Sequence, residues 1–240
     1  MGKNMSDINS KPETIDEAEF RNPERIQRSI LSTMEKRTLI WIAKRLPRWI
    51  GSDFLTLLGF AGMILTGVSY ALGSWTPFAP LLATFFLAVN WFGDSLDGTV
   101  ARVRNRQRPR YGFYVDHAVD TIGILFLMGG LAVSPYMSPW VAAGFLIAYY
   151  FLCIEIYLST ATIGKFKLSF GLLGPTEFRI LLAIGNIALL SHPTVHLAGR
   201  EFRTFDTGGI PGIIVVMCLG LFSMIRNTVS LYRLEALPDK

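Results

Sequence analysis

Apolar residues in this chain are gathered into six blocks that short polar segments separate. The blocks are Phe54–Leu72, Phe78–Phe92, Phe113–Val133, Val141–Leu158, Phe178–Leu190 and Ile210–Leu231. A helix needs about 20 mostly apolar residues to cross the hydrocarbon core of a bilayer. The second and fifth blocks are the short ones, and we expect the second to continue as a helix beyond the membrane surface. The pattern predicts an all-α integral membrane protein with six transmembrane helices.

The segment before the first block divides into two parts. Residues 1–22 are mostly polar, with Pro, Asp and Glu among them, and are predicted to form a disordered tail. Over residues 23–49, apolar side chains alternate with Arg and Lys, which predicts an amphipathic juxtamembrane helix. Such a helix lies either on the cytoplasmic membrane surface or packed on the transmembrane body. Residues 50–240 then make up the six-helix transmembrane domain.

Basic residues give the predicted helices an orientation, because Lys and Arg gather on the cytoplasmic side of membrane proteins. With six spans and the N-terminus in the cytoplasm, Arg200 and Arg203 are the two of the 23 Lys and Arg residues that fall outside. The basic run from Arg102 to Arg110 falls inside, as do Lys165 and Lys167. Both termini are therefore expected in the cytoplasm.

Composition excludes other classes of protein. A soluble domain would carry more charge than the 17% found here beside 51% hydrophobic residues. Cys153 and Cys218 both lie in apolar blocks, without the spacing of a disulfide framework or a zinc site. The formal charge of +5 sits beside hydrophobic spans, so the lipid bilayer with its anionic headgroups is the expected partner, and nucleic acid is not.

Four aspartates lie at or near the cytoplasmic ends of two apolar blocks: Asp94, Asp97, Asp116 and Asp120. Carboxylates at membrane depth are costly and usually serve a function. The first pair is three residues apart and the second is four apart, so each pair shares one face of its helix. A short loop makes the two helices antiparallel neighbours. Both pairs are therefore expected at the same depth, around a polar cavity that faces the cytoplasm.

Carboxylates so close together repel one another unless a cation neutralises them. Mg²⁺ prefers oxygen ligands and commonly binds a few carboxylates together with substrate phosphates. We therefore expect two Mg²⁺ ions at these aspartates, with Mn²⁺ as a possible substitute. Two such ions can clamp a diphosphate, and a carboxylate that stays off the metal can act as a general base.

Small residues between the aspartates belong to the same pattern. Gly98 and Ala101 fall on the side of the helix that carries the first aspartate pair, and Gly112 is one turn before the second. The missing side chains would let a ligand approach the backbone closely. Arg102, one turn past Gly98, is suited to a phosphate oxygen.

Written in full, the segment reads Asp94-x2-Asp97-Gly98-x2-Ala101-Arg102-x9-Gly112-x3-Asp116-x3-Asp120. It closely resembles the signature of the CDP-alcohol phosphotransferases, a family that makes phospholipids or their precursors. The signature fixes eight residue identities over 27 positions, and every one is present. The predicted six spans also match the topology of this family. Members of the family often form homodimers, so the resemblance implies a homodimer here.

The resemblance implies a role for each matching residue. It assigns the metal pair to Asp94, Asp97 and Asp116, with Asp120 as a further ligand or as the catalytic base, the role for which Asp120 is the usual candidate. It assigns nucleotide binding to Gly98, Ala101, Arg102 and Gly112. Members often carry Pro-Asn-x-x-Thr at the start of the first span, where this chain has Ser52-Asp53-x-x-Thr56. By this weaker match Thr56 and Asp53 also bind the nucleotide, although Asp53 could equally cap the helix.

Charged residues near the fourth and fifth blocks complete the set of candidates. Glu177 and Arg179 open the fifth block from the inside, and they either line the acceptor pocket or form a structural ion pair. Lys165 either attracts an anionic acceptor to the same pocket or is an ordinary charge of the cytoplasmic side. Glu155 lies within the fourth block, where a buried acid usually has a partner such as Lys or Arg.

The resemblance implies a membrane-bound transferase of phospholipid biosynthesis. An acceptor hydroxyl, deprotonated by Asp120, would attack the phosphorus distal to cytidine, and CMP would leave. CDP-diacylglycerol with a small hydroxyl acceptor is the preferred pair, because it is the commoner donor in the family. A CDP-aminoalcohol, with choline or ethanolamine, acting on diacylglycerol is the alternative. A cation transporter is the rival from another class, and the clustering of the acids on one side disfavours it.

Overall fold

The computed structural model describes residues 24–26, 32–163, 165–167, 175–197 and 199–235, and it is nearly all helical. The helices are α1 (Ser32–Arg45), α2 (Ser52–Ala71), α3 (Ala79–Val103), α4 (Pro109–Val133), α5 (Pro139–Ile163), α6 (Pro175–Ser191) and α7 (Thr204–Leu234), with a short 3-10 helix, η2 (Leu72–Ser74), after α2. In this part of the chain, four short strands form two pairs: β1 (Glu24–Ile26) with β2 (Lys165–Lys167), and β3 (Thr194–Leu197) with β4 (Arg200–Arg203).

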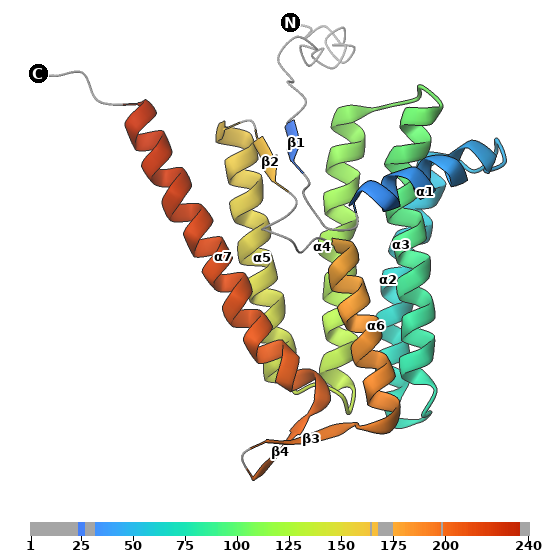
Figure 1. The fold of residues 1–240 in the computed structure, drawn as a ribbon, viewed down its shortest axis with the longest axis vertical. Helices are drawn as coiled ribbons and strands as arrows, with labels where there is room; N and C mark the ends of the chain where they lie inside the picture. Colours follow the sequence, from blue (N-terminus) through green and yellow to red (C-terminus); the bar gives the residue numbers. More distant parts are fainter. Residues whose placement is uncertain (1–23, 27–31, 164, 168–174, 198, 236–240) are drawn as a thin grey trace, which may run out of the picture.

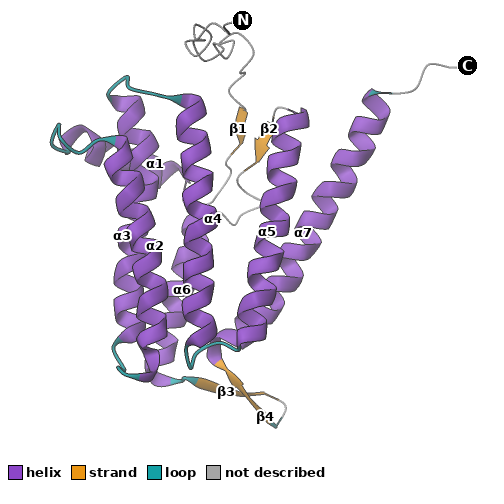
Figure 2. Ribbon diagram, turned by 180° about the vertical axis from the view of Figure 1, so that it is seen from behind, coloured by secondary structure: helices purple, strands orange, loops and turns teal. Residues whose placement is uncertain are grey.

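Helices α2 to α6 form a bundle along one direction, and α7 leans away from it at the end that carries α1 (Figure 1). The connection between α3 and α4 lies at this same end, whereas the β3–β4 hairpin lies at the opposite end (Figures 1 and 2). Within the described ranges, five helices are long and apolar enough to cross a membrane: α2 with η2, α3, α4, α5 and α7. This confirms the prediction of a helical membrane protein. Helix α6, with 17 residues, is shorter than these five.

Proline marks the start of four helices. Pro80 lies in the first turn of α3, and helices α4, α5 and α6 begin at Pro109, Pro139 and Pro175. Proline suits the first turn of a helix because its missing N–H has no partner there and its φ is already close to helical. Each proline stands just before or at the beginning of an apolar block, which is why the blocks predicted the order of the helices.

Glycines bring α2 into close backbone contact with α3 and α4. A Cβ atom built on Gly59 would lie 3.0 Å from the backbone nitrogen of Asp94. A Cβ on Gly130 would lie 1.9 Å from the carbonyl oxygen of Gly67. Helices approach this closely where small residues meet, and van der Waals packing then holds them together in a membrane. The glycine contacts therefore set the relative positions of α3 and α4, the two helices that carry the aspartates.

Two consecutive side-chain hydrogen bonds join α2, α6 and α3 inside the bundle. The Tyr70 hydroxyl donates to Asn186 Oδ1 at 2.9 Å, and Asn186 Nδ2 donates to Thr84 Oγ1 at 3.0 Å. Tyr70 and Asn186 are fully buried. A polar group in this environment is costly unless it has a hydrogen-bond partner. These two hydrogen bonds therefore specify where α6 lies against α2 and α3.

Helix α1 differs in extent from the predicted helix over residues 23–49. It covers Ser32–Arg45, and Glu24–Ile26 instead form strand β1, which pairs in parallel with β2. Leu39 and Ala43 of α1 are buried against Leu55, Leu96 and Val100 of α2 and α3. The helix therefore packs on the transmembrane body. The predicted tail, residues 1–22, lies outside the described residues.

Arg104 ties the connection between α1 and α2 to the end of α3. Its guanidinium donates to the backbone carbonyls of Leu46 and Pro47, each at 3.0 Å, and of Ile50 at 2.6 Å. Arg104 therefore has a structural role. It also belongs to the basic run Arg102–Arg110, which predicts that this end of the helices faces the cytoplasm. The hydrogen bonds of Arg104 hold α1 beside the first turn of α2.

The β3–β4 hairpin occupies the predicted outer loop between α6 and α7. Arg203 at its end donates to the carbonyls of Ser134 at 3.2 Å and Met137 at 2.7 Å. The buried Asp206 accepts hydrogen bonds from the Ser138 backbone N–H at 2.7 Å and from its hydroxyl at 2.5 Å. The start of α7 is thereby fastened to the connection between α4 and α5.

Glu155 has partners other than the expected Lys or Arg. Its Oε1 accepts hydrogen bonds from Ser223 Oγ at 3.1 Å and from Asn227 Nδ2 at 2.8 Å, both on α7. Helices α5 and α7 are therefore joined by a carboxylate with neutral donors. Both of these donors are neutral, whereas the sequence suggested Lys or Arg as a partner.

We expect Glu155→Ala to lower the free energy of unfolding by about 2 kcal/mol, because it leaves the buried hydroxyl of Ser223 and the half-buried amide of Asn227 without this acceptor. Glu155→Gln keeps the accepting oxygen and is expected to stay close to the wild type. Thermal unfolding in detergent measures both. Equal destabilisation by the two variants would show that the negative charge, and not the pair of hydrogen bonds, is what matters.

Candidate active site

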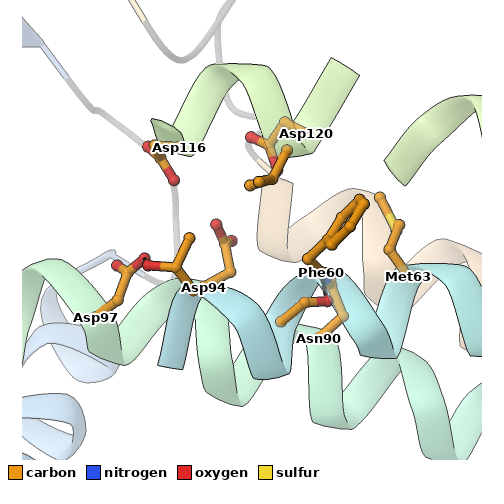
Figure 3. Close-up of a pocket in the computed structure, with 10 residues that line it drawn as sticks. Phe60, Met63, Asn90, Asp94, Asp97, Asp116 and Asp120 are labelled. Atoms are coloured by element: carbon orange, nitrogen blue, oxygen red, sulfur yellow. Dashed lines mark hydrogen bonds between the residues drawn. The ribbon is translucent and has the colours of Figure 1, made fainter. Parts of the chain in front are cut away.

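The four aspartates of the signature meet between α3 and α4. Asp116 and Asp120 project from α4 toward Asp94 and Asp97 on α3 (Figure 3). Carboxylate oxygens of Asp94, Asp116 and Asp120 lie within 4.8 Å of one another. The three- and four-residue spacings place each pair on one helix face, and the antiparallel packing brings the two faces together. The spacing therefore predicted a convergence that the fold contains.

Asp97 is held by two hydrogen bonds. Thr56 Oγ1 on α2 donates to its Oδ2 at 2.7 Å, and the backbone N–H of Gly98 donates to its Oδ1. Hydrogen bonds to an ionised carboxylate stabilise the charged form and fix its orientation. Thr56, predicted to bind the nucleotide, therefore lies in contact with one of the four aspartates.

Arg179 on α6 reaches into the same cluster. Its Nη2 lies 2.5 Å from Asp94 Oδ2, and its Nε donates to Asn90 Oδ1 at 2.8 Å. Asn90 in turn donates to the carbonyl of Gly59 at 2.9 Å. The side chains of the ion pair are 13% and 24% exposed, so the interaction is shielded from water. The sequence suggested for Arg179 a place in the acceptor pocket or an ion pair with Glu177, and the ion pair that it forms in the structure is with Asp94, an aspartate of the signature.

Asn90 was missed as a site residue although the sequence carried a signal for it. It is a polar residue inside an apolar block, and it lies four residues before Asp94 and seven before Asp97. These intervals place the three side chains on one face of α3. Asn90 is 3% exposed and joins α2, α3 and α6 at the floor of the site.

A cavity of about 960 Å³ opens beside the aspartates, with α1 forming part of its wall. Its lining includes most of the predicted site: Asp53, Thr56, Asp94, Asp97, Gly98, Ala101, Arg102, Gly112, Asp116 and Arg179. Basic side chains on the same wall are Lys36, Arg106 and Arg108. Asp120 lies beside a small pocket together with Phe60 and Met63 (Figure 3).

The small residues of the signature leave space on the cavity wall. A Cβ on Gly112 would meet nothing within 4 Å, and one on Gly98 would meet only Arg102 Nη1, at 3.5 Å. Arg102 Nη2 donates to Thr99 Oγ1 at 3.1 Å, which holds its guanidinium along α3. A flat ligand can therefore approach the backbone of α3 and α4 at these two glycines.

Three further predicted residues are Asp53, Glu177 and Lys165. Asp53 forms an exposed ion pair with Arg108, and this hydrogen bond raises the pKa of Arg108 above its usual value. Glu177 is half-buried in the first turn of α6 and is not among the residues that line the cavity. Lys165 belongs to strand β2, and its side chain lies outside the described part of the chain. The cavity wall thus includes Asp53 but not Glu177.

The donor set suits a hard divalent cation. Three carboxylates offer oxygens within 4.8 Å, and Asp97 lies beside them. Arg179 contacts one of the four carboxylates, which leaves a strong concentration of negative charge. Mg²⁺ and Mn²⁺ prefer all-oxygen ligands of this kind, commonly shared with substrate phosphates. Basic residues on the cavity wall provide a complementary surface for those phosphates.

Comparison with known proteins gives consistent matches. The family model for CDP-alcohol phosphatidyltransferase matches residues 49–225. The chain is 27% identical over 207 residues to cholinephosphotransferase 1 of Danio rerio, which covers 78% of this chain and 52% of that protein. It is 26% identical over 183 residues to archaetidylinositol phosphate synthase of Methanothermobacter thermautotrophicus, which covers 76% of this chain and 83% of that protein. The chain spans about half the length of the cholinephosphotransferase and most of the length of the synthase.

Proposed function

The chain belongs to the CDP-alcohol phosphatidyltransferase family, and from this we propose that it is a membrane transferase of phospholipid biosynthesis. It moves a phosphatidyl group from a CDP-alcohol to a hydroxyl acceptor and releases CMP. The observation that carries the proposal is the convergence of the four signature aspartates beside a cavity of about 960 Å³. That volume lies at the upper end of the range usual for small-molecule sites.

The proposed donor is CDP-diacylglycerol, and the proposed acceptor is a small hydroxyl compound. The coverage of the matches supports this choice, because the chain aligns with 83% of a synthase of an inositol phosphate lipid and with 52% of a cholinephosphotransferase. A CDP-aminoalcohol as donor, with diacylglycerol as acceptor, is the second candidate. The similarity to cholinephosphotransferases favours it.

The proposed metal ligands are Asp94, Asp97, Asp116 and Asp120, which would hold two Mg²⁺ ions or, in their place, Mn²⁺. When bound, these ions would neutralise the diphosphate of the donor and the charge that develops on the leaving CMP. Thr56 supports this arrangement, because its hydrogen bond orients Asp97. Residues that orient metal ligands in this way commonly contribute to metal affinity.

The proposed reaction is an in-line displacement at the phosphorus distal to cytidine. Asp120 takes the proton of the acceptor hydroxyl, the acceptor oxygen forms a bond to that phosphorus, and the bond to the CMP oxygen breaks. Asp120 suits the role of base because it lies at the inner end of the aspartate cluster, beside Phe60 and Met63 (Figure 3). The protein contributes mainly by positioning the reactants and by stabilising charge.

The nucleotide half of the cavity is proposed to be formed by Asp53, Thr56, Gly98, Ala101, Arg102 and Gly112. All six line the cavity, and Arg102 supplies a cation for the diphosphate. The acceptor half is proposed to lie at the start of α6, where Arg179 lines the wall next to Asp94. Lys165 and Glu177 are proposed to contribute from its edge.

The proposed topology has six spans, with α6 as the short one beside the five longer helices. Both termini and the active site would face the cytoplasm, because the Lys and Arg residues gather at the end that carries the α3–α4 connection. The protein would consist of a polar tail over residues 1–22, a juxtamembrane segment over 23–49 and a catalytic domain over 50–240. A homodimer is proposed because members of the family often form homodimers.

The test is CMP release from purified protein in detergent, with Mg²⁺ and a panel of substrates. The panel pairs CDP-diacylglycerol with serine, glycerol 3-phosphate or inositol 1-phosphate, and pairs CDP-choline or CDP-ethanolamine with diacylglycerol. We expect release with one of these pairs. A chain that binds and moves divalent cations into liposomes, but releases no CMP with any pair, would favour the rival function of a cation transporter.

Removing the metal is expected to abolish activity and to lower stability. Excess EDTA should reduce CMP release by at least about a hundredfold, since the clustered carboxylates lose the charge that positions the diphosphate. Mg²⁺ or Mn²⁺ should restore it, and either ion should raise the thermal unfolding temperature of the substrate-free protein. Asp94→Asn should weaken that rise. Full activity after removal of all divalent ions would contradict the assignment.

A further inference from the structure

We propose that Glu35 of α1 is a positioning residue that holds the first turn of α6 against α3, so that Arg179 reaches the aspartate site. The inference rests on the transferase function proposed above. It gives helix α1 a part in the site beyond its packing on the transmembrane body. The cavity wall already includes this helix through Glu35, Lys36 and Leu39.

One carboxylate oxygen of Glu35 accepts hydrogen bonds from side chains of two other helices. Its Oε1 accepts hydrogen bonds from Trp91 Nε1 at 2.8 Å and from Thr176 Oγ1 at 2.8 Å, with Ser95 Oγ at 3.5 Å. Trp91 and Ser95 lie on α3, and Thr176 lies in the first turn of α6. Hydrogen bonds to an ionised acceptor are stronger than neutral ones, and here they are half-buried. Glu35 therefore bridges α3 and α6 from outside both helices.

The bridge lies one helical turn from the aspartate site. Thr176 and Arg179 are three residues apart and share a face of α6. Thr176 contacts Glu35, and Arg179 contacts Asp94 at 2.5 Å and Asn90 at 2.8 Å. Two polar links therefore fix the first turn of α6 against α3. If the Glu35 link were lost, the contacts of Arg179 would be the remaining one of these two links. The first turn of α6 could then move, and the guanidinium would no longer be held in a single position beside Asp94.

The kinetic test compares Glu35→Ala and Glu35→Gln, with the substrate pair of the panel above that releases CMP. Glu35→Ala should raise the KM for the acceptor about tenfold and leave the KM for the CDP donor within about twofold, because α6 borders the acceptor half of the cavity. Glu35→Gln keeps the accepting oxygen and should remain within about twofold of the wild type. Arg37→Ala, an exposed residue of the same helix, is the matched control and should change neither constant.

The second part of the test substitutes Thr176, which donates the hydrogen bond from α6 to Glu35. Thr176→Val should repeat the acceptor defect of Glu35→Ala, and Thr176→Ser should not. The double variant Glu35→Ala/Thr176→Val should be no worse than Glu35→Ala by more than about twofold, because both changes break the same link. Additive defects in the double variant, or equal rises in both KM values in Glu35→Ala, would overturn the inference.

Trp91 gives a readout that does not depend on activity. Glu35→Ala should shift the tryptophan emission to longer wavelength, because the half-buried indole loses its acceptor and becomes hydrated. The same substitution in a Trp91→Phe background should produce no shift. An unchanged emission in Glu35→Ala would overturn the inference, even if the wild type proved inactive with every substrate pair. A shifted emission together with an inactive wild type would instead count against the proposed function alone.

Discussion

Replacing Asp120 with Asn is expected to lower the rate of CMP release by about a thousandfold, the range usual for loss of a general base. The amide has nearly the shape of the carboxylate but cannot accept the proton of the acceptor hydroxyl. The loss should therefore appear in kcat, and the KM values should change little. Thermal unfolding should show that the variant is folded. Steady-state CMP release at saturating substrates is the measurement.

Asp206→Asn is the matched control for this prediction. Asp206 is 5% exposed and lies in the first turn of α7. That turn directly follows the β3–β4 hairpin, which is at the end of the bundle opposite to α1 (Figure 1). Its hydrogen bonds come from Ser138, so its substitution tests the loss of a buried carboxylate away from the aspartates. We expect it to cost some stability and to leave kcat within about twofold. If raised Mg²⁺ restored the activity of Asp120→Asn, Asp120 would act through metal binding alone and would not also be the base.

Gly130→Ala is expected to destabilise the bundle strongly, although it adds only one methyl group. The added Cβ would lie 1.9 Å from the carbonyl oxygen of Gly67, a backbone atom that cannot move aside. Helices α2 and α4 would have to separate, at a cost of about 3 kcal/mol. For a chain of this length that cost corresponds to a fall of about 10 °C in the unfolding temperature. Thermal unfolding of the purified protein in detergent measures it.

Gly129→Ala is the control, because a Cβ on Gly129 would meet nothing within 4 Å. It lies on the same helix and adds the same methyl group, so it separates the close contact from any general effect of the glycine. We expect it to leave the unfolding temperature unchanged or slightly higher, since alanine favours the helix. Equal falls in both variants would show that the backbone contact between α2 and α4 is not what makes Gly130 necessary.

The sequence predicted the helices and the aspartate cluster for local reasons. Proline at the helix starts and apolar blocks of bilayer length depend on residues that are neighbours along the chain. The facing pairs Asp94/Asp97 and Asp116/Asp120 depend on helical spacing and one short loop. Information of this kind is contained in fewer than about thirty consecutive residues, so no knowledge of the tertiary packing was required.

The contacts that were missed join residues far apart in the chain. Glu35 is 56 residues from Trp91 and 141 residues from Thr176. Arg104 binds carbonyl groups more than fifty residues before it, which a local pattern cannot distinguish from a basic orientation signal. The pairing of β1 with β2 joins Glu24 to Lys165 through strands of three residues, too short to show an alternating pattern. Such features follow from how the helices pack.

The most direct test of the central claim is the stoichiometry of transfer by the purified wild-type protein. With the active donor and acceptor and Mg²⁺, the account predicts one CMP released for each molecule of lipid product formed. It also predicts no burst of CMP when the acceptor is left out, because the acceptor oxygen attacks the donor directly. CMP released without acceptor, or in excess of the product, would contradict direct transfer between the two substrates at the aspartate site.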